Sequence, residues 1–142
     1  MGIKVLLVDD EEEFIALLSK RMKSRGFHVD IANSGIKALE KVDEKAYDAI
    51  ILDLYMPEMD GIDTLKHLLQ KNTDLQIIFL TGHATLEKGI EAVKLGAIDF
   101  MEKPVDMDKL IEKVNDAKTK KDILLEQKAK KDIDDLLKKK GW

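Results

Sequence analysis

The chain has 142 residues, of which 44% are hydrophobic and 37% charged, which is enough for one domain with a buried core. It contains no cysteine, which excludes a disulfide framework and a thiolate metal site. The 24 basic and 28 acidic residues give a net charge of −4, which argues against non-specific affinity for nucleic acid, and no apolar run approaches the roughly 20 residues of a membrane-spanning helix.

Five short apolar runs along the chain have the character of strands. In chain order they are Ile3–Val8, Phe27–Ala32, Ala49–Leu52, Ile77–Leu80 and Ala97–Met101. Most are almost continuously hydrophobic, as in strands that are buried on both faces of a parallel sheet. Phe27–Ala32 instead alternates with polar residues, which predicts a strand at the edge of the sheet. The first run is too short for a signal peptide and leads directly into acids, so a cytoplasmic location is expected.

Amphipathic helices are predicted between and after these runs. Their first apolar positions are Phe14, Ile36, Ile62, Ile90 and Met107. The first helix is expected to end at Gly26 and the fourth at Gly96, while Asn33 or Ser34 caps the second. Five alternating β/α units predict an α/β three-layer sandwich with right-handed crossovers.

Polar residues follow four of the five predicted strands. Asp9 and Asp10 come after the first strand and Asp53 after the third. Thr81 follows the fourth strand and Lys103 the fifth. Each alone is most simply a turn or capping residue, but ligands of open parallel sheets bind beyond the carboxyl ends of the strands, where all of these residues would meet. Crowded carboxylates raise one another's pKa unless a cation compensates, and Mg²⁺ suits an oxygen-only site of this kind.

With these residues in place, the chain resembles the receiver domain of bacterial two-component response regulators over about residues 2–118. The matching motifs, in the order and spacing of the family, are LLVDDEE, DAIILDLYMPEMDG, IIFLTGH and DFMEKPV. The resemblance implies a doubly wound, flavodoxin-like sheet of order 2-1-3-4-5. The region that begins with LTGHATLEKG is most similar to receivers of the nitrogen-regulatory type.

The resemblance also implies a role for each residue at the strand ends. Asp53 matches the phosphoacceptor, Thr81 the hydroxyl that bonds the phosphoryl group, and Lys103 the ammonium that neutralises its charge. Asp9 and Asp10 match the acidic pair that holds Mg²⁺, for which Mn²⁺ is an expected substitute. Asp10 would be the direct ligand, and Asp9 would act mainly through water.

Three further positions carry expectations from the same resemblance. The backbone carbonyl of Tyr55 matches the third protein ligand of the metal, and Phe100 stands where the family carries an aromatic switch that works with Thr81. The Tyr55 side chain and His83 stand two residues beyond Asp53 and Thr81, where side chains tune the lifetime of the phosphoryl group. A simpler alternative stays open for both, namely loop packing for Tyr55 and an exposed capping residue for His83.

A lysine-rich stretch without Gly or Pro runs from Asp106 to Lys140. One uninterrupted helix of this length would measure about 50 Å at 1.5 Å per residue. It carries an apolar stripe at Leu125, Ala129, Ile133 and Leu136. Lys118 and Lys121 separate this stripe from the core face, which predicts that the helix leaves its own domain before the stripe begins. Association with a partner or a second copy, folding back as a sixth helix, and fraying all stay open.

The predicted protein is a receiver domain at residues 1–118 with a C-terminal helical extension at 119–142. It takes a phosphoryl group from a sensor histidine kinase, catalyses its own phosphorylation and dephosphorylation, and signals to a downstream protein or passes the group to a histidine phosphotransfer protein. No direct nucleic-acid or membrane contact is expected. A homodimer would use either the face made by the fourth helix, fifth strand and fifth helix or the C-terminal helix.

Alternatives from other classes meet specific obstacles in the sequence. A flavodoxin-like FMN redox protein needs a phosphate-cradling loop where DDEEE stands. A phosphatase of the haloacid dehalogenase kind needs a second Asp where Tyr55 stands. A receiver fragment of a longer transcriptional regulator stays open.

Overall fold

The computed structural model describes residues 2–82 and 85–141 and contains one parallel sheet of order β2-β1-β3-β4-β5. Its strands are β1 (Lys4–Val8), β2 (His28–Ala32), β3 (Ala49–Leu52), β4 (Ile77–Thr81) and β5 (Asp99–Glu102). The predicted strand order is confirmed, and β2 lies at the edge, as its alternating pattern predicts. Because β1 pairs with β3 in a register that sets Val8 beside Leu52, the residues that follow these strands, Asp9 and Asp53, are neighbours.

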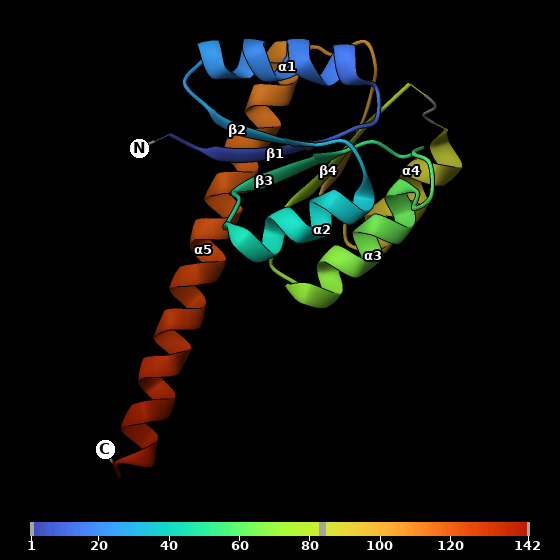
Figure 1. Ribbon diagram of the computed structural model, residues 1–142. Helices are drawn as coiled ribbons and strands as arrows, with labels where there is room; N and C mark the ends of the chain where they lie inside the picture. The colour runs from blue at the N-terminus through green and yellow to red at the C-terminus, as the bar shows by residue number, and fades with distance from the viewer. Residues whose placement is uncertain (1, 83–84, 142) are drawn as a thin grey trace.

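Helices cover both faces of this sheet, which confirms the predicted three-layer sandwich (Figure 1). They are α1 (Glu12–Ser24), α2 (Gly35–Glu44), α3 (Gly61–Lys71), α4 (Leu86–Lys94) and α5 (Met107–Lys139). Alternate side chains of each central strand enter different cores. Leu6 packs in the core beneath α2, α3 and α4, whereas Leu7 packs in the core beneath α1 and α5.

The helix ends follow from local chemistry. The side chains of Ser34, Asp60 and Asp106 each accept a backbone N–H in the first turn of α2, α3 and α5, which satisfies a donor that has no partner within the helix. Ser34 is one of the two caps predicted for α2. Gly26 follows α1 with φ of 92° and Gly96 follows α4 with φ of 117°, in the left-handed region that only glycine enters without strain.

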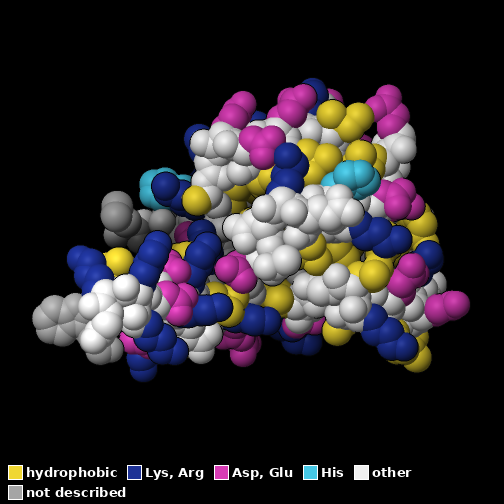
Figure 2. Space-filling model, turned by 90° about the horizontal axis from the view of Figure 1, so that it is seen from below, with side chains coloured by type: hydrophobic (Ala, Val, Ile, Leu, Met, Phe, Trp, Pro, Cys, Tyr) yellow, Lys and Arg dark blue, Asp and Glu magenta, His cyan; other side chains and the backbone are white. Residues whose placement is uncertain are grey.

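α5 is a continuous helix of 33 residues that extends well beyond the sheet (Figure 1). The alternative in which the tail folds back as a sixth helix is therefore wrong. Its projecting part exposes the large apolar side chains Ile123, Leu125, Ile133, Leu136 and Leu137. Figure 2, seen from below, shows lysines and acids mixed along this end of the molecule. Among the described residues, no helix is both long enough and apolar enough to cross a bilayer.

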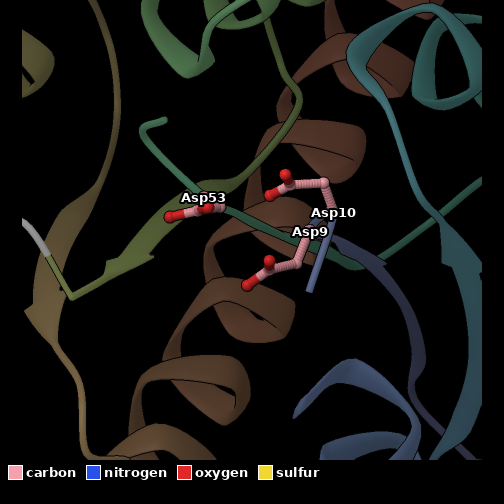
Figure 3. A group of neighbouring side chains, drawn as sticks. All are labelled: Asp9, Asp10 and Asp53. Atoms are coloured by element: carbon pink, nitrogen blue, oxygen red, sulfur yellow. The ribbon is translucent and has the colours of Figure 1, made fainter. Parts of the chain in front are cut away.

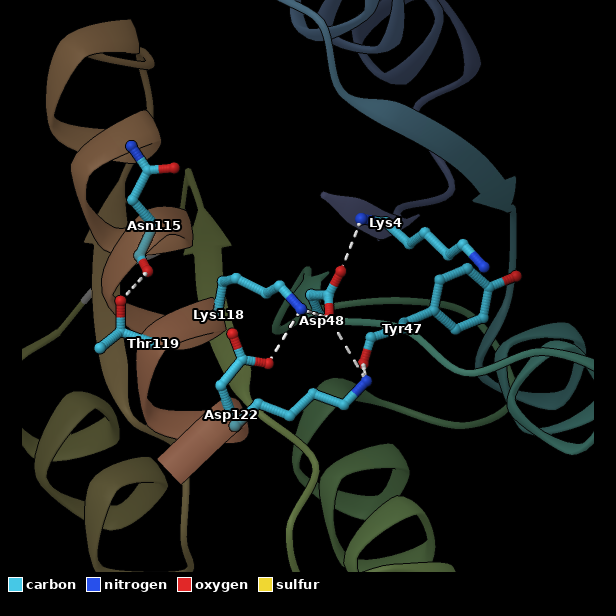
Figure 4. A network of polar contacts seen from close by, with 8 residues as sticks. Lys4, Tyr47, Asp48, Asn115, Lys118, Thr119 and Asp122 are labelled. Atoms are coloured by element: carbon cyan, nitrogen blue, oxygen red, sulfur yellow. Dashed lines mark hydrogen bonds and ion pairs between the residues drawn. The ribbon is translucent and has the colours of Figure 1, made fainter. Parts of the chain in front are cut away.

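The helix leaves its domain before the exposed stripe that begins at Leu125, as predicted, but Lys118 and Lys121 still contact the domain. Both bind Asp48, a buried residue directly before β3, with their Nζ atoms 3.3 and 3.4 Å from its Oδ1 atom (Figure 4). Lys121 Nζ also donates to the carbonyl oxygen of Tyr47 at 2.8 Å, and Asp48 Oδ2 accepts the backbone N–H of Lys4 at 2.8 Å. The sheet therefore holds α5 for a further turn beyond its last core residue.

Candidate functional site

The ends of four neighbouring strands bring the predicted polar residues to one rim of the sheet. Asp9 follows β1 and Asp53 follows β3, while Thr81 ends β4. All three side chains are buried, whereas Asp10 is exposed. Asp9, Asp10 and Asp53 each offer a carboxylate oxygen, and these oxygens lie within 4.8 Å of one another (Figure 3).

Asp9 is held in place from two sides. Its Oδ1 atom accepts the backbone N–H of Glu11 at 2.9 Å, which shapes the turn into α1. Its Oδ2 atom accepts a hydrogen bond from Lys103 Nζ at 2.9 Å, and that ammonium also lies 3.3 Å from Glu11 Oε1. Burial raises the pKa of Asp9, and the hydrogen bond from Lys103 opposes this shift. Lys103 is thus paired with Asp9 and Glu11.

Asp53 is a buried acid with an incompletely satisfied carboxylate. Its Oδ1 atom is buried and has no hydrogen-bond partner within the described part of the chain. Burial and the neighbouring charge of Asp9 raise the pKa of Asp53 to about 6, while Lys103 and the hydrogen bond with the Thr81 side chain act in the opposite direction. A buried carboxylate oxygen without a partner is unfavourable in itself, so this atom is available to a ligand.

The loop after β3 fixes the backbone of Asp53. The N–H of Gly61 donates to the carbonyl oxygen of Leu54 at 2.7 Å, which closes the loop. A Cβ atom at Gly61 would lie 2.3 Å from the carbonyl oxygen of Asp53, so only glycine allows this approach. Tyr55 is exposed in the loop, with 44% of its surface accessible. The other candidate for tuning the phosphoryl lifetime, His83, lies outside the described residues.

Phe100 lies on β5, opposite Phe79 of β4, and the centroids of the two rings are 6.1 Å apart. Its ring is half-buried and faces α4, where a Cβ atom at Gly89 would lie 3.4 Å from it. Beside it is an open hollow of about 580 Å³, also lined by Leu86 and Ile90. The predicted switch residue therefore has free space next to it.

Two residues at the rim were given no role from the sequence, Glu11 and Phe14. Glu11 forms the second ion pair of Lys103, and the Phe14 ring lies 4.1 Å from Lys103 Nζ. Glu11 had one available signal, since it continues the acidic run after Asp10. Phe14 had none, because an aromatic residue at the first apolar position of a helix indicates core packing.

The acidic cluster fits a hard divalent cation. Its donors are carboxylate oxygens, which Mg²⁺ prefers. Lys103 forms an ion pair with Asp9 and acts on Asp53 only from a distance, and the buried Oδ1 of Asp53 is left without a partner among the described residues. A divalent cation would supply the missing positive charge and a partner for that atom.

Comparisons with known proteins agree on one family. The model of the response regulator receiver domain matches residues 5–115. The transcriptional regulatory protein ZraR of Klebsiella oxytoca is 39% identical over 108 residues, which is 76% of this chain and 24% of ZraR. The chain thus spans about a quarter of the length of that relative.

Solved structures show the same fold. A response regulator receiver domain protein from Clostridium thermocellum superposes with a TM-score of 0.82 at 31% identity, covering 86% of this chain and 98% of that one. The beryllofluoride-activated NtrC4 receiver domain, solved as a dimer, superposes with a TM-score of 0.78 at 31% identity, covering 83% of this chain and 98% of that one. On the family match, the strand order and the acidic rim together, the chain belongs to the receiver domains of response regulators.

Proposed function

We propose that this receiver accepts a phosphoryl group on Asp53 from a sensor histidine kinase. The observation that carries the proposal is the Oδ1 atom of Asp53, which is buried, lacks a hydrogen-bond partner among the described residues, and faces a rim that holds two more acids and an ammonium. Asp9, Asp10, Asp53 and the backbone carbonyl of Tyr55 would hold Mg²⁺ there, with Mn²⁺ as a substitute.

The transfer follows from what each residue offers. A carboxylate oxygen of Asp53 forms a bond to phosphorus, the bond from phosphorus to the imidazole nitrogen of the kinase histidine breaks, and its electron pair stays on that nitrogen. Lys103 then turns from Asp9 to the oxygens of the transferred group, and the Thr81 hydroxyl donates a hydrogen bond to them. Bound Mg²⁺ would neutralise charge on the same oxygens. Catalysis here is mainly positioning and electrostatics.

Signalling would begin with the added charge, which is roughly −1.5 to −2 at neutral pH. Thr81 lies at the end of β4 and Phe100 on the adjacent β5. A shift of Thr81 toward the phosphoryl group opens space into which the Phe100 ring can move, away from the hollow beside α4. The surface made by α4, β5 and α5 would then change and alter its affinity for a protein partner.

Acetyl phosphate tests the site directly. Wild type incubated with acetyl phosphate and Mg²⁺ should gain the mass of one phosphoryl group, whereas Asp53→Asn should gain none and EDTA should prevent the gain in wild type. Asp116→Asn is the matched control, because it makes the same charge change at an exposed position of α5 and should behave as wild type. A full phosphoryl gain on Asp53→Asn would refute the assignment.

A second candidate concerns the whole protein. ZraR is about four times longer than the matched stretch, which supports a receiver that is part of a longer transcriptional regulator. The kinase, and a downstream protein or histidine phosphotransfer protein, are the proposed partners, and the cytoplasm is the proposed place of the reaction. We further propose a receiver at residues 1–118 and an extension at 119–142, with self-association through the α4, β5 and α5 surface or the projecting part of α5.

A further inference from the structure

Within the described parts of the chain, the ammonium of Lys103 contacts two anions and one aromatic ring. Asp9 Oδ2 lies 2.9 Å and Glu11 Oε1 3.3 Å from Nζ, while the centroid of the Phe14 ring lies 4.1 Å from it. The Lys103 side chain is only 11% exposed, so the ring acts on a partly desolvated cation. Such a cation–π contact is stronger than one at an open surface.

The anions and the ring hold Lys103 in different ways. Asp9 and Glu11 each accept a hydrogen bond from Nζ, so they must release the ammonium before it can bind a phosphoryl oxygen. The ring attracts the ammonium through its π face without accepting a conventional hydrogen bond, and it leaves the N–H groups free to turn. Contact with Phe14 can therefore continue while Lys103 exchanges one anion for another.

The position of the ring is set by the packing of α1. Ile15 and Leu18 of this helix are buried in the core shared with α5, and they fix the helix against the sheet. Phe14 is only half-buried and shares a surface hollow of about 440 Å³ with Lys103 and Leu17. The ring thus packs against the edge of this core on one side and reaches Lys103 at the rim on the other.

We propose that Phe14 is a positioning residue, whose ring keeps the Lys103 ammonium over the acidic rim while it turns from Asp9 and Glu11 to the phosphoryl group on Asp53. The inference rests on the proposed phosphorylation of Asp53. Without the ring, Lys103 loses the aromatic contact at its ammonium, and the ammonium spends more time turned away from the phosphoryl oxygens.

Three substitutions test this role through the rate of phosphorylation by acetyl phosphate at saturating Mg²⁺. Phe14→Leu keeps an apolar side chain and removes the π face, and it should lower the rate constant about three- to tenfold. Phe14→Tyr keeps the face and should stay within about twofold of wild type. Leu17→Ala, three residues further along the same helix and lining the same hollow, should leave the rate unchanged. A Phe14→Leu rate equal to wild type overturns the proposal.

A double-mutant cycle separates positioning from general damage to the fold. Because Phe14 is proposed to act only through the ammonium, Phe14→Leu should not lower the rate further in a Lys103→Met background. An equal fractional loss in both backgrounds would mean that the ring acts by some other route, and the proposal would be wrong. The affinity for Mg²⁺, measured in the same variants, should change less than the rate constant.

A nuclear magnetic resonance measurement reports the contact without any phosphorylation. The ring current of Phe14 should shift the Lys103 Hε resonances upfield, and Phe14→Leu should abolish that shift. If Phe14→Leu abolishes the shift of the Lys103 resonances but leaves the phosphorylation rate unchanged, the positioning role is wrong and the proposed function stands. Absence of labelling on wild type instead overturns the proposed function, and the resonance shift then supports the ring contact alone.

Discussion

Replacing the proposed phosphoacceptor should make the metal-free protein more stable. Asp53→Asn removes a buried negative charge that burial and Asp9 oppose, and these effects raise the pKa of Asp53 from 3.8 to about 6. A shift of about 2 pKa units means that the folded state disfavours the charged form of this group, relative to the unfolded state, by roughly 3 kcal/mol. The neutral amide keeps the shape of the carboxylate, so we expect a gain of roughly 2 to 3 kcal/mol at pH 7.5 in EDTA.

The sign of the pH dependence follows from the same shift. Because the folded-state pKa lies above the unfolded-state value, the folded wild type binds more protons between about pH 4 and pH 6, and its free energy of unfolding falls as the pH rises through that window. The advantage of Asp53→Asn should be complete above pH 6 and should vanish below about pH 4. Added Mg²⁺ should stabilise wild type more than the variant, because Asp53 is part of the proposed cation site.

Urea denaturation, followed by circular dichroism, measures this effect. With a slope of about 2 kcal/mol per molar urea, the midpoint of Asp53→Asn should lie on the order of 1 M above that of wild type in EDTA. Asp116→Asn, at an exposed position, should move the midpoint little. A midpoint for Asp53→Asn at or below that of wild type at pH 7.5 would refute the claim that this carboxylate is buried without compensation.

Further substitutions test other parts of the structure. Gly61→Ala should destabilise the fold by roughly 1 to 3 kcal/mol and slow phosphorylation, because the new Cβ would meet the backbone of Asp53; unfolding and labelling rates check this. Asp48→Asn should destabilise by about 1 to 3 kcal/mol at pH 7, because it leaves Lys118 and Lys121 without their shared anion; urea midpoints at pH 7 and pH 3 measure it. Ending the chain after Lys118 should preserve labelling by acetyl phosphate, which intact-mass measurement checks, since the α5 residues of the core lie before that point.

The acidic rim was predictable because sheet topology alone determines which strand ends meet. Once β1 and β3 are adjacent and parallel, Asp9 and Asp53 must lie at the same edge whatever their side chains do. The helix caps were predictable for a similar reason, since Ser34 and Gly96 act through their own backbone neighbourhood. Such inferences need only local patterns and the order of the strands.

Side-chain contacts between residues far apart in the sequence were not predictable in this way. Lys118 and Lys121 were predicted only to separate the core face of the helix from the apolar stripe, whereas both bind Asp48, directly before β3. The spacing of residues along α5 contains no information about that acid. Phe14 was likewise predicted only as an apolar position of its helix. Its contact with Lys103 depends on the path of the loop that follows β5, which the sequence of α1 does not indicate.

Asp48 and Asp53 flank the same strand, β3, and show that burial alone does not identify a functional acid. Both side chains are almost inaccessible, at 7% and 4% exposure. Burial acts to raise the pKa of Asp48, but the N–H of Lys4 and the two lysines of α5 outweigh it and lower that pKa, whereas the pKa of Asp53 is raised. The difference is compensation: both oxygens of Asp48 have partners, while Oδ1 of Asp53 has none among the described residues. The described residues thus compensate the buried charge of Asp48 but not that of Asp53, which supports the proposal that Asp53 binds a divalent cation and accepts a phosphoryl group.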